Sequence, residues 1–113
     1  MKKQDTNVHY RQGDVLLERV EEVPSSAKKQ QVKGRIILAH GEATGHHHSL
    51  ALAEPDSADW WKADDAGDIQ YVDLRADAKL VHQEHAAVEL PAGRYRVTRQ
   101  REYSPEAIRR VAD

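Results

Sequence analysis

Residues 35–53, with the sequence RIILAHGEATGHHHSLALA, give the clearest indication of the fold. Residues 35–40 form an apolar run of strand length that ends at a glycine. Residues 46–53 then alternate with a period of two, and such residues share one face of a β-strand. The residues on that face are His46, His48, Leu50 and Leu52. Both segments therefore predict β-strands, and histidines lie at the strand ends.

The remainder of the chain follows the same pattern of short strands. The further strand candidates are residues 14–20, 69–74, 80–90 and 94–103. Residues 25–34 are predicted to form a loop or a frayed strand edge, and residues 54–67 a long loop that carries Trp60 and Trp61. Adjacent residues of an extended chain point to opposite sides, so we expect one tryptophan in the core and the other in a lid or an interface.

A short helix is expected near the end of the chain. Ser104 is a favourable N-cap, Pro105 suits the first turn, and Glu106 favours the positive end of a helix. The 80–90 run either continues as one strand or breaks at residues 83–85. Six or so strands without alternating helices predict a mainly β fold. We expect a small antiparallel β-barrel or sandwich with one short C-terminal helix, in a single domain of residues 1–113.

The composition excludes several classes of protein. The 113 residues include no cysteine, which excludes a disulfide scaffold, a cysteine nucleophile and a thiolate metal site. No apolar run is long enough to span a membrane, and the charged start of the chain lacks the apolar segment of a secretory signal. We therefore expect a cytoplasmic protein with no membrane partner. The low apolar content supports only a thin core, which favours a homodimer.

The charges are distributed unevenly along the chain, although the net charge is only −2. Residues 54–77 are strongly acidic, whereas residues 94–110 carry six arginines against two glutamates. A basic segment on a mildly acidic protein suits a small anionic ligand better than a long nucleic acid. The alternative is that both segments are simply solvated surface.

The histidines carry the chemical signal. Six of the seven lie between residues 40 and 85, in one group at residues 40–48 and another at residues 82–85. A glutamate accompanies each group, Glu42 in the first and Glu84 in the second. Imidazole titrates near neutral pH and serves as a general acid, a general base or a metal ligand. The isolated His9 is expected to be a surface or core residue without a functional role, and a solvent-exposed polar loop is the alternative interpretation of both groups.

A metal site is one functional interpretation of these groups. His46 and His48 share a strand face, so they can offer two imidazoles to one ion, and His82 and His85 can complete the set. In this alternative the protein is a metal-binding protein or metalloenzyme that holds a divalent transition metal.

Two segments resemble cupin motifs. In the first motif a glycine precedes a His-x-His pair and a glutamate follows. The matching residues here are Gly41, His46, His48 and Glu54. Residues 91–93, Pro-Ala-Gly, resemble the turn of the second motif. This chain departs from that second motif at Arg96, where the motif has its histidine.

Metal-free cleavage of a phosphodiester is the other functional interpretation, and it is the preferred one. RNA carries its own nucleophile, the 2′-hydroxyl, so one imidazole can take the 2′-proton while another protonates the leaving 5′-oxygen. The candidate catalytic residues are His46, His48, His82, His85, Glu42 and Glu84. The candidate substrate-binding residues are Arg99, Arg101, Tyr103 and Trp60. The arginines would hold phosphate, and an aromatic ring would stack on a base. No cofactor is needed for this reaction.

Four short segments resemble a known family. They are Tyr10-Arg11-Gln12-Gly13-Asp14, Gly41-Glu42 with Thr44-Gly45-His46 and His48, His82 with Glu84-His85, and Gln100-Arg101-Glu102-Tyr103. This ordered set resembles the extrachromosomal ring nucleases, small proteins carried by phages and plasmids that degrade the cyclic oligoadenylate messengers of type III CRISPR defence. The resemblance implies a dimeric, metal-independent, anti-CRISPR ring nuclease whose partner is a small cyclic or linear oligonucleotide.

The strand pattern also predicts how the two histidine groups meet. His46 and His48 share their strand face with Leu50 and Leu52. His82 shares parity with Leu80, Val88 and Leu90, so the two histidine groups are expected to converge on one cavity. An interaction module is a third possibility, with the paired tryptophans and the arginines as its interface. It leaves both histidine groups unexplained.

Overall fold

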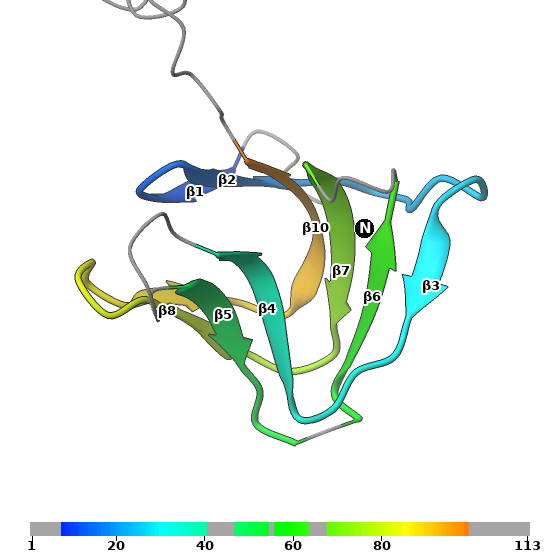
Figure 1. Ribbon diagram of the computed structural model, residues 1–113. Helices are drawn as coiled ribbons and strands as arrows, with labels where there is room; N and C mark the ends of the chain where they lie inside the picture. Colours follow the sequence, from blue (N-terminus) through cyan, green and yellow to red (C-terminus); the bar gives the residue numbers. More distant parts are fainter. Residues whose placement is uncertain (1–7, 41–46, 55, 64–67, 100–113) are drawn as a thin grey trace, which may run out of the picture.

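The computed structural model describes residues 8–40, 47–54, 56–63 and 68–99 (Figure 1). These residues form short β-strands. The strands are β1 (His9–Gln12), β2 (Val15–Arg19), β3 (Lys28–Gln30), β4 (Arg35–His40), β5 (His47–Ala51), β6 (Ala58–Lys62), β7 (Ile69–Leu74), β8 (Ala78–Val81), β9 (Val88–Leu90) and β10 (Gly93–Arg99).

The strands belong to two sheets. One has six strands in the order β1-β2-β10-β7-β6-β3, and the other has four in the order β4-β5-β8-β9. Every neighbouring pair runs antiparallel. In Figure 1, β4, β5 and β8 lie to one side of the curved six-stranded sheet. The prediction of a mainly β, antiparallel fold is confirmed. The described strands do not close into a barrel, because each sheet ends in edge strands.

No part of the described chain is helical. The predicted C-terminal helix lies outside the described residues. Where the structure is described, no helix is long and apolar enough to cross a membrane.

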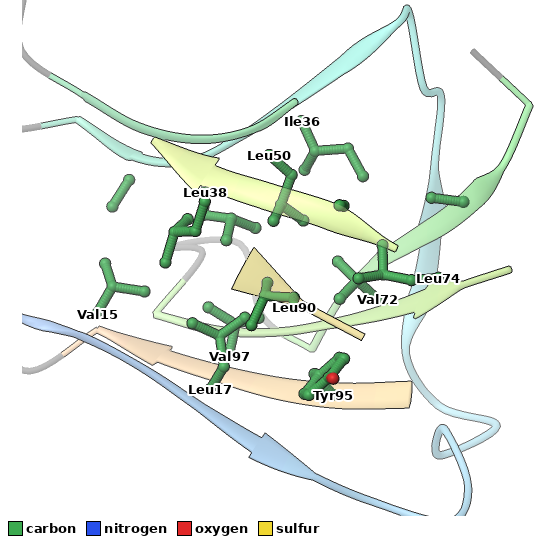
Figure 2. Packing of buried hydrophobic residues seen from close by; sticks show 14 residues of the cluster. Val15, Leu17, Ile36, Leu38, Leu50, Val72, Leu74, Leu90, Tyr95 and Val97 are labelled. Carbon is green, nitrogen blue, oxygen red and sulfur yellow. The ribbon is translucent and has the colours of Figure 1, made fainter. Parts of the chain in front are cut away.

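One hydrophobic core lies between the two sheets (Figure 2). The six-stranded sheet contributes Val15, Leu17, Val72, Leu74, Tyr95 and Val97, and the four-stranded sheet contributes Ile36, Leu38, Leu50, Leu80 and Leu90. Buried residues alternate with partly exposed ones along β7, where the burial pattern has a period of two. The alternation therefore turns one face of each sheet toward the shared core.

Two buried glutamines join the sheets across this core. Gln12 of β1 donates its Nε2 hydrogens to the carbonyls of Leu80 and Ala86, both at 2.9 Å. Gln70 of β7 donates from Nε2 to the carbonyl of Leu38 at 2.7 Å. Gln70 also accepts a hydrogen bond from the Trp60 indole at 2.8 Å through its Oε1. Each side-chain amide therefore satisfies backbone carbonyls of the segments that lie across the core.

The structure decides one open alternative of the strand prediction and corrects another part of it. The 80–90 run is broken, with β8 ending at Val81 and β9 beginning at Val88. Residues 58–62 were expected in a long loop, but they form β6, which pairs with β3 and β7. In β6 Trp60 packs against the core, whereas Trp61 lines a hollow on the surface. The two tryptophans therefore point to opposite sides, as predicted.

Candidate functional site

A tight turn between β1 and β2 positions the first part of the site. Gln12 pairs with Val15, so only Gly13 and Asp14 form the turn. Gly13 has a φ of 59° and stands at the first central position, where a type II′ hairpin turn favours glycine. A Cβ atom on Gly13 would lie 2.9 Å from His85 Nε2 and 3.2 Å from His48 Cε1. The turn therefore packs directly against two imidazoles.

His48 of β5 is the buried centre of the site, with 3% of its surface exposed. Its Nδ1 lies 2.9 Å from Gln12 Oε1, and its Nε2 lies 3.2 Å from Asp14 Oδ1. A bulge between Ile37 and Ala39 shifts the β4–β5 register, so that Ala39 pairs with His48. Bulges of this kind redirect side chains next to functional sites.

The hydrogen bonds around His48 fix the position of its proton. Gln12 uses its amide nitrogen for two backbone carbonyls, so its Oε1 faces His48 and accepts from Nδ1–H. In the neutral ring the lone pair of Nε2 then faces the Asp14 carboxylate. The pair of His48 Nε2 and Asp14 Oδ1 therefore lacks one proton for a hydrogen bond, which makes it a proton acceptor.

The environment keeps His48 neutral near pH 7. Burial, followed by the nearby His82, lowers the pKa of His48 from 6.5 to about 4. The charge and hydrogen bond of Asp14 act in the opposite direction. His48 is thus held in its basic form, beside a carboxylate that favours the arrival of a proton.

Two further imidazoles complete what we call the histidine cluster, which consists of His48, His82 and His85. The ring centroids of His48 and His82 are 4.4 Å apart, and those of His82 and His85 are 4.6 Å apart. His85 also stacks on His48 at 5.9 Å with an interplanar angle of 18°. The three rings differ in their exposure to solvent: His48 is buried, His82 is half-buried and His85 is exposed.

The cluster lies beside a cationic group. Arg99, at the end of β10, places its Nε 3.4 Å from Asp14 Oδ2. Asp14 therefore stands between the guanidinium of Arg99 and the imidazole of His48, and 30% of its side chain remains exposed. A row of cation, carboxylate and imidazole can hold an anion and exchange a proton at the same place.

The structure brings together part of the predicted site. His48, His82 and His85 meet although they come from both histidine groups, and Arg99 joins them through Asp14. The backbone N–H of Glu84 donates to His82 Nδ1 at 3.0 Å.

Of the other predicted site residues, one lies within the described part of the chain and four do not. Trp60 lies in β6, which is separated from β2 by β7 and β10, and its indole bonds Gln70. The predicted site residues Glu42, His46, Arg101 and Tyr103 lie outside the described residues.

Sequence reasoning missed the two residues that hold His48. Gln12 and Asp14 flank Gly13, and a glycine between two strand-forming segments is a signal for a hairpin turn. The sequence does not say that this turn packs against β5, which lies in the other sheet.

The metal alternative requires at least three ligands around one ion. Within the described ranges, no three or more histidine and acidic side chains are arranged to hold a metal ion. One of the four proposed ligands, His46, lies outside those ranges.

The fold and the site define a class: a small protein of two antiparallel sheets with a buried histidine held between an amide and a carboxylate. Residues 11–100 match the family model described as Domain of unknown function (DUF8820), so the chain belongs to this family. No curated protein and no solved structure matches the chain.

Proposed function

We propose that the protein is a metal-independent phosphodiesterase that acts on an RNA-type ligand. The observation that carries this proposal is the convergence of three imidazoles, a carboxylate and a guanidinium at one place. His48 and His82 lie 4.4 Å apart between ring centroids, and Asp14 links His48 to Arg99. General acid–base cleavage of RNA needs a proton acceptor, a proton donor and a positive charge near the phosphate.

The pair of His48 and Asp14 is the proton acceptor in this mechanism. The two atoms that face each other, Nε2 and Oδ1, are 3.2 Å apart and lack one proton. The exposed part of Asp14 gives a substrate hydroxyl access to the pair. A phosphate anion bound nearby raises the pKa of the imidazole, so substrate binding strengthens a base that is otherwise kept neutral.

His85 is the proton donor, because it is the exposed member of the cluster and can recover a proton from water after each turnover. Arg99 stabilises the charge that develops on the phosphate oxygens. The 2′-oxygen forms a bond to phosphorus, its proton passes to the His48–Asp14 pair, and the bond from phosphorus to the 5′-oxygen breaks. The 5′-oxygen takes a proton from the His85 imidazolium, which leaves a 2′,3′-cyclic phosphate and a 5′-hydroxyl.

Cyclic oligoadenylate is the candidate substrate. The support for this choice is the resemblance to ring nucleases, in which the segment of Gln12, Gly13 and Asp14 is one of the matching parts. That segment lies at the histidine cluster. A ring nuclease of this kind acts in the cytoplasm, and we propose that it works as a homodimer.

The test is incubation of the protein with cyclic and linear oligoadenylates, with and without EDTA. We expect cleavage that survives EDTA and produces 2′,3′-cyclic phosphate ends. His85→Ala and Asp14→Asn should each lower turnover by a factor on the order of 10² or more, as the loss of a general acid or base does. His9→Ala is the matched control, because His9 is exposed and pairs only with Glu18 at 3.4 Å among its described ion pairs.

Three outcomes would contradict the proposal. Cleavage that EDTA abolishes and one divalent metal restores would favour the cupin-like alternative. Unchanged turnover in both His85→Ala and Asp14→Asn would show that the catalytic site is elsewhere. An absence of cleavage of every oligoadenylate would reject the proposed substrate class.

A further inference from the structure

A second feature lies on the outer face of the four-stranded sheet, behind the histidine cluster. It is a hollow of about 250 Å³, which we call the outer hollow. Its lining residues are Arg35, His47, Ser49, Val81, His82 and Gln83. A water molecule takes up about 30 Å³ in the liquid, so the hollow has room for a small hydrated group.

The strand register explains why these side chains share the outer face. Ser49 pairs with Val81 across β5 and β8, and Ile37 of β4 lies opposite Ser49. The neighbouring residues His48 and Leu50 point to the other side, where Leu50 belongs to the core. Alternation along β5 thus sends successive residues to the cluster and to the outer hollow.

The charge of the outer hollow is positive. Its described lining includes Arg35 and two histidines but no carboxylate. Arg35 is exposed, and no described carboxylate forms an ion pair with it. Arg75 and Arg94 differ in this respect, because they pair with Asp59 and Asp73. A cation without a paired carboxylate in a concave site attracts anions.

Two residues of the outer hollow, Gln83 and Arg35, can donate hydrogen bonds to a ligand. The Gln83 Oε1 accepts a hydrogen bond from the backbone N–H of His47 at 2.9 Å, which leaves the amide hydrogens of Gln83 as its donors. The guanidinium of Arg35 can only donate. An oxyanion is the ligand that such a set of donors satisfies.

We propose that the outer hollow binds a phosphate group of the substrate, beside the group that is cleaved. The assignment of this phosphate to an oligonucleotide rests on the proposed function. His82 belongs both to the outer hollow and to the histidine cluster, where its ring lies 4.4 Å from that of His48. A phosphate held in the outer hollow therefore anchors the ligand next to the proton-transfer groups, and Arg35 sets the affinity.

The test measures binding without cleavage. Inorganic phosphate and a 2′-deoxy-oligoadenylate, which lacks the nucleophilic hydroxyl, are titrated into the full chain and followed by amide NMR shifts. We expect saturable shifts at His47, Ser49 and Val81. Arg35→Ala should weaken binding of both probes about tenfold, as expected for the loss of a charge-assisted hydrogen bond.

Lys79→Ala is the matched control. Lys79 is an exposed cation in β8 of the same sheet, and Arg35, Ala51 and Lys79 lie side by side across three strands. Lys79 lines a different hollow. Lys79→Ala therefore removes one positive charge, as Arg35→Ala does, but leaves the lining of the proposed subsite intact. We expect a change of less than about twofold, since long-range effects of surface charges are screened by salt.

The outcomes separate this inference from the proposed function. Saturable binding that depends on Arg35 supports the subsite even if ribo-oligoadenylates are not cleaved. No saturable binding, equal losses in Arg35→Ala and Lys79→Ala, or shifts confined to Gly13, Asp14 and Arg99 would overturn it. Inorganic phosphate that binds as tightly as the deoxy-oligoadenylate would overturn the assignment to an oligonucleotide.

Discussion

At the scale of single residues, the site depends on a glycine that has no side chain. Gly13 adopts a φ of 59°, and a Cβ atom there would lie within 3.2 Å of atoms of both His85 and His48. The same turn carries Asp14, whose carboxylate lies 3.2 Å from His48. Gly13 therefore has two separate roles: it permits the turn, and it lets the turn approach the imidazoles closely.

Gly13→Ala tests these two roles against Gly34→Ala. Both glycines have a positive φ, but the space around Gly34 is open within 4 Å. Both variants should lose about 1–2 kcal/mol of stability from the left-handed backbone, measured by urea unfolding. Only Gly13→Ala should also displace the His85 ring, visible as altered imidazole NMR resonances of His85 and His48. Unchanged imidazole resonances in Gly13→Ala would mean that the turn does not support the histidine cluster.

The same scale shows what the sequence could predict about the site. Alternation along the strands predicted that the two histidine groups converge, and the rings of His48 and His82, one from each group, lie 4.4 Å apart. His46, which the same prediction included, lies outside the described residues. The partners of His48 were missed, because Gln12 and Asp14 reach it through the packing of a hairpin against the other sheet. Such packing leaves no local pattern in the sequence.

At the scale of elements, strands with an apolar face were predictable and polar strands were not. The predicted bounds of β4 and β7 agree with the structure, since both carry apolar residues on a buried face. β1 has the sequence HYRQ, with only Gln12 buried, and its pairing with β2 holds it in place. In β6 the aspartate-rich surroundings hid the alternation, and its Asp59 is neutralised by Arg75 and Lys29 from other segments.

The joining of the two sheets by Gln70 gives a prediction at this scale. Gln70→Leu keeps the size of the side chain but leaves the Leu38 carbonyl and the Trp60 indole without this partner. Because each buried unsatisfied group costs about 1–3 kcal/mol, we expect a loss on the order of 3 kcal/mol in the free energy of unfolding. Gln30→Leu is the control, because its amide makes only an exposed bond to Lys28 within β3 among its described hydrogen bonds. The control should stay within about 0.5 kcal/mol of the wild type. Equal free energies of unfolding for the two variants would show that the hydrogen bonds of Gln70 do not stabilise the packing of the two sheets.

At the scale of the whole molecule, the site and the core are parts of one structure. Gln12 contacts Leu80 and Ala86 near the core and His48 in the cluster with the same amide group. The His48 side chain lies on the same inward face of β5 as that of Leu50, which is fully buried. Protonation of His48 therefore acts on the stability of the entire fold as well as on the candidate chemistry.

The pH dependence of unfolding follows from this coupling. Burial and the neighbouring His82 lower the pKa of His48 to about 4, whereas an unfolded histidine titrates near 6.5. Between these two values the unfolded chain binds a proton that the folded chain does not. The contribution of His48 to the free energy of unfolding should therefore be fully present above about pH 6.5. It should fall by about 3 kcal/mol as the pH drops toward 4.

Urea unfolding at several pH values between 7.5 and 4 measures this loss, and two variants separate His48 from the other titrating groups. His48→Asn should have a flatter dependence, because the carboxylates still titrate but the buried imidazole is gone. His9→Ala should retain the wild-type dependence, since the His9 side chain is 52% exposed and its ion pair with Glu18 contributes little. Parallel curves for wild type and His48→Asn would mean that the folded protein accommodates a charged His48. In that case the Asp14 carboxylate already offsets the cost of burying the charge, the pKa of His48 lies near the unfolded value of about 6.5, and the proton acceptor of the proposed mechanism would be partly protonated near neutral pH.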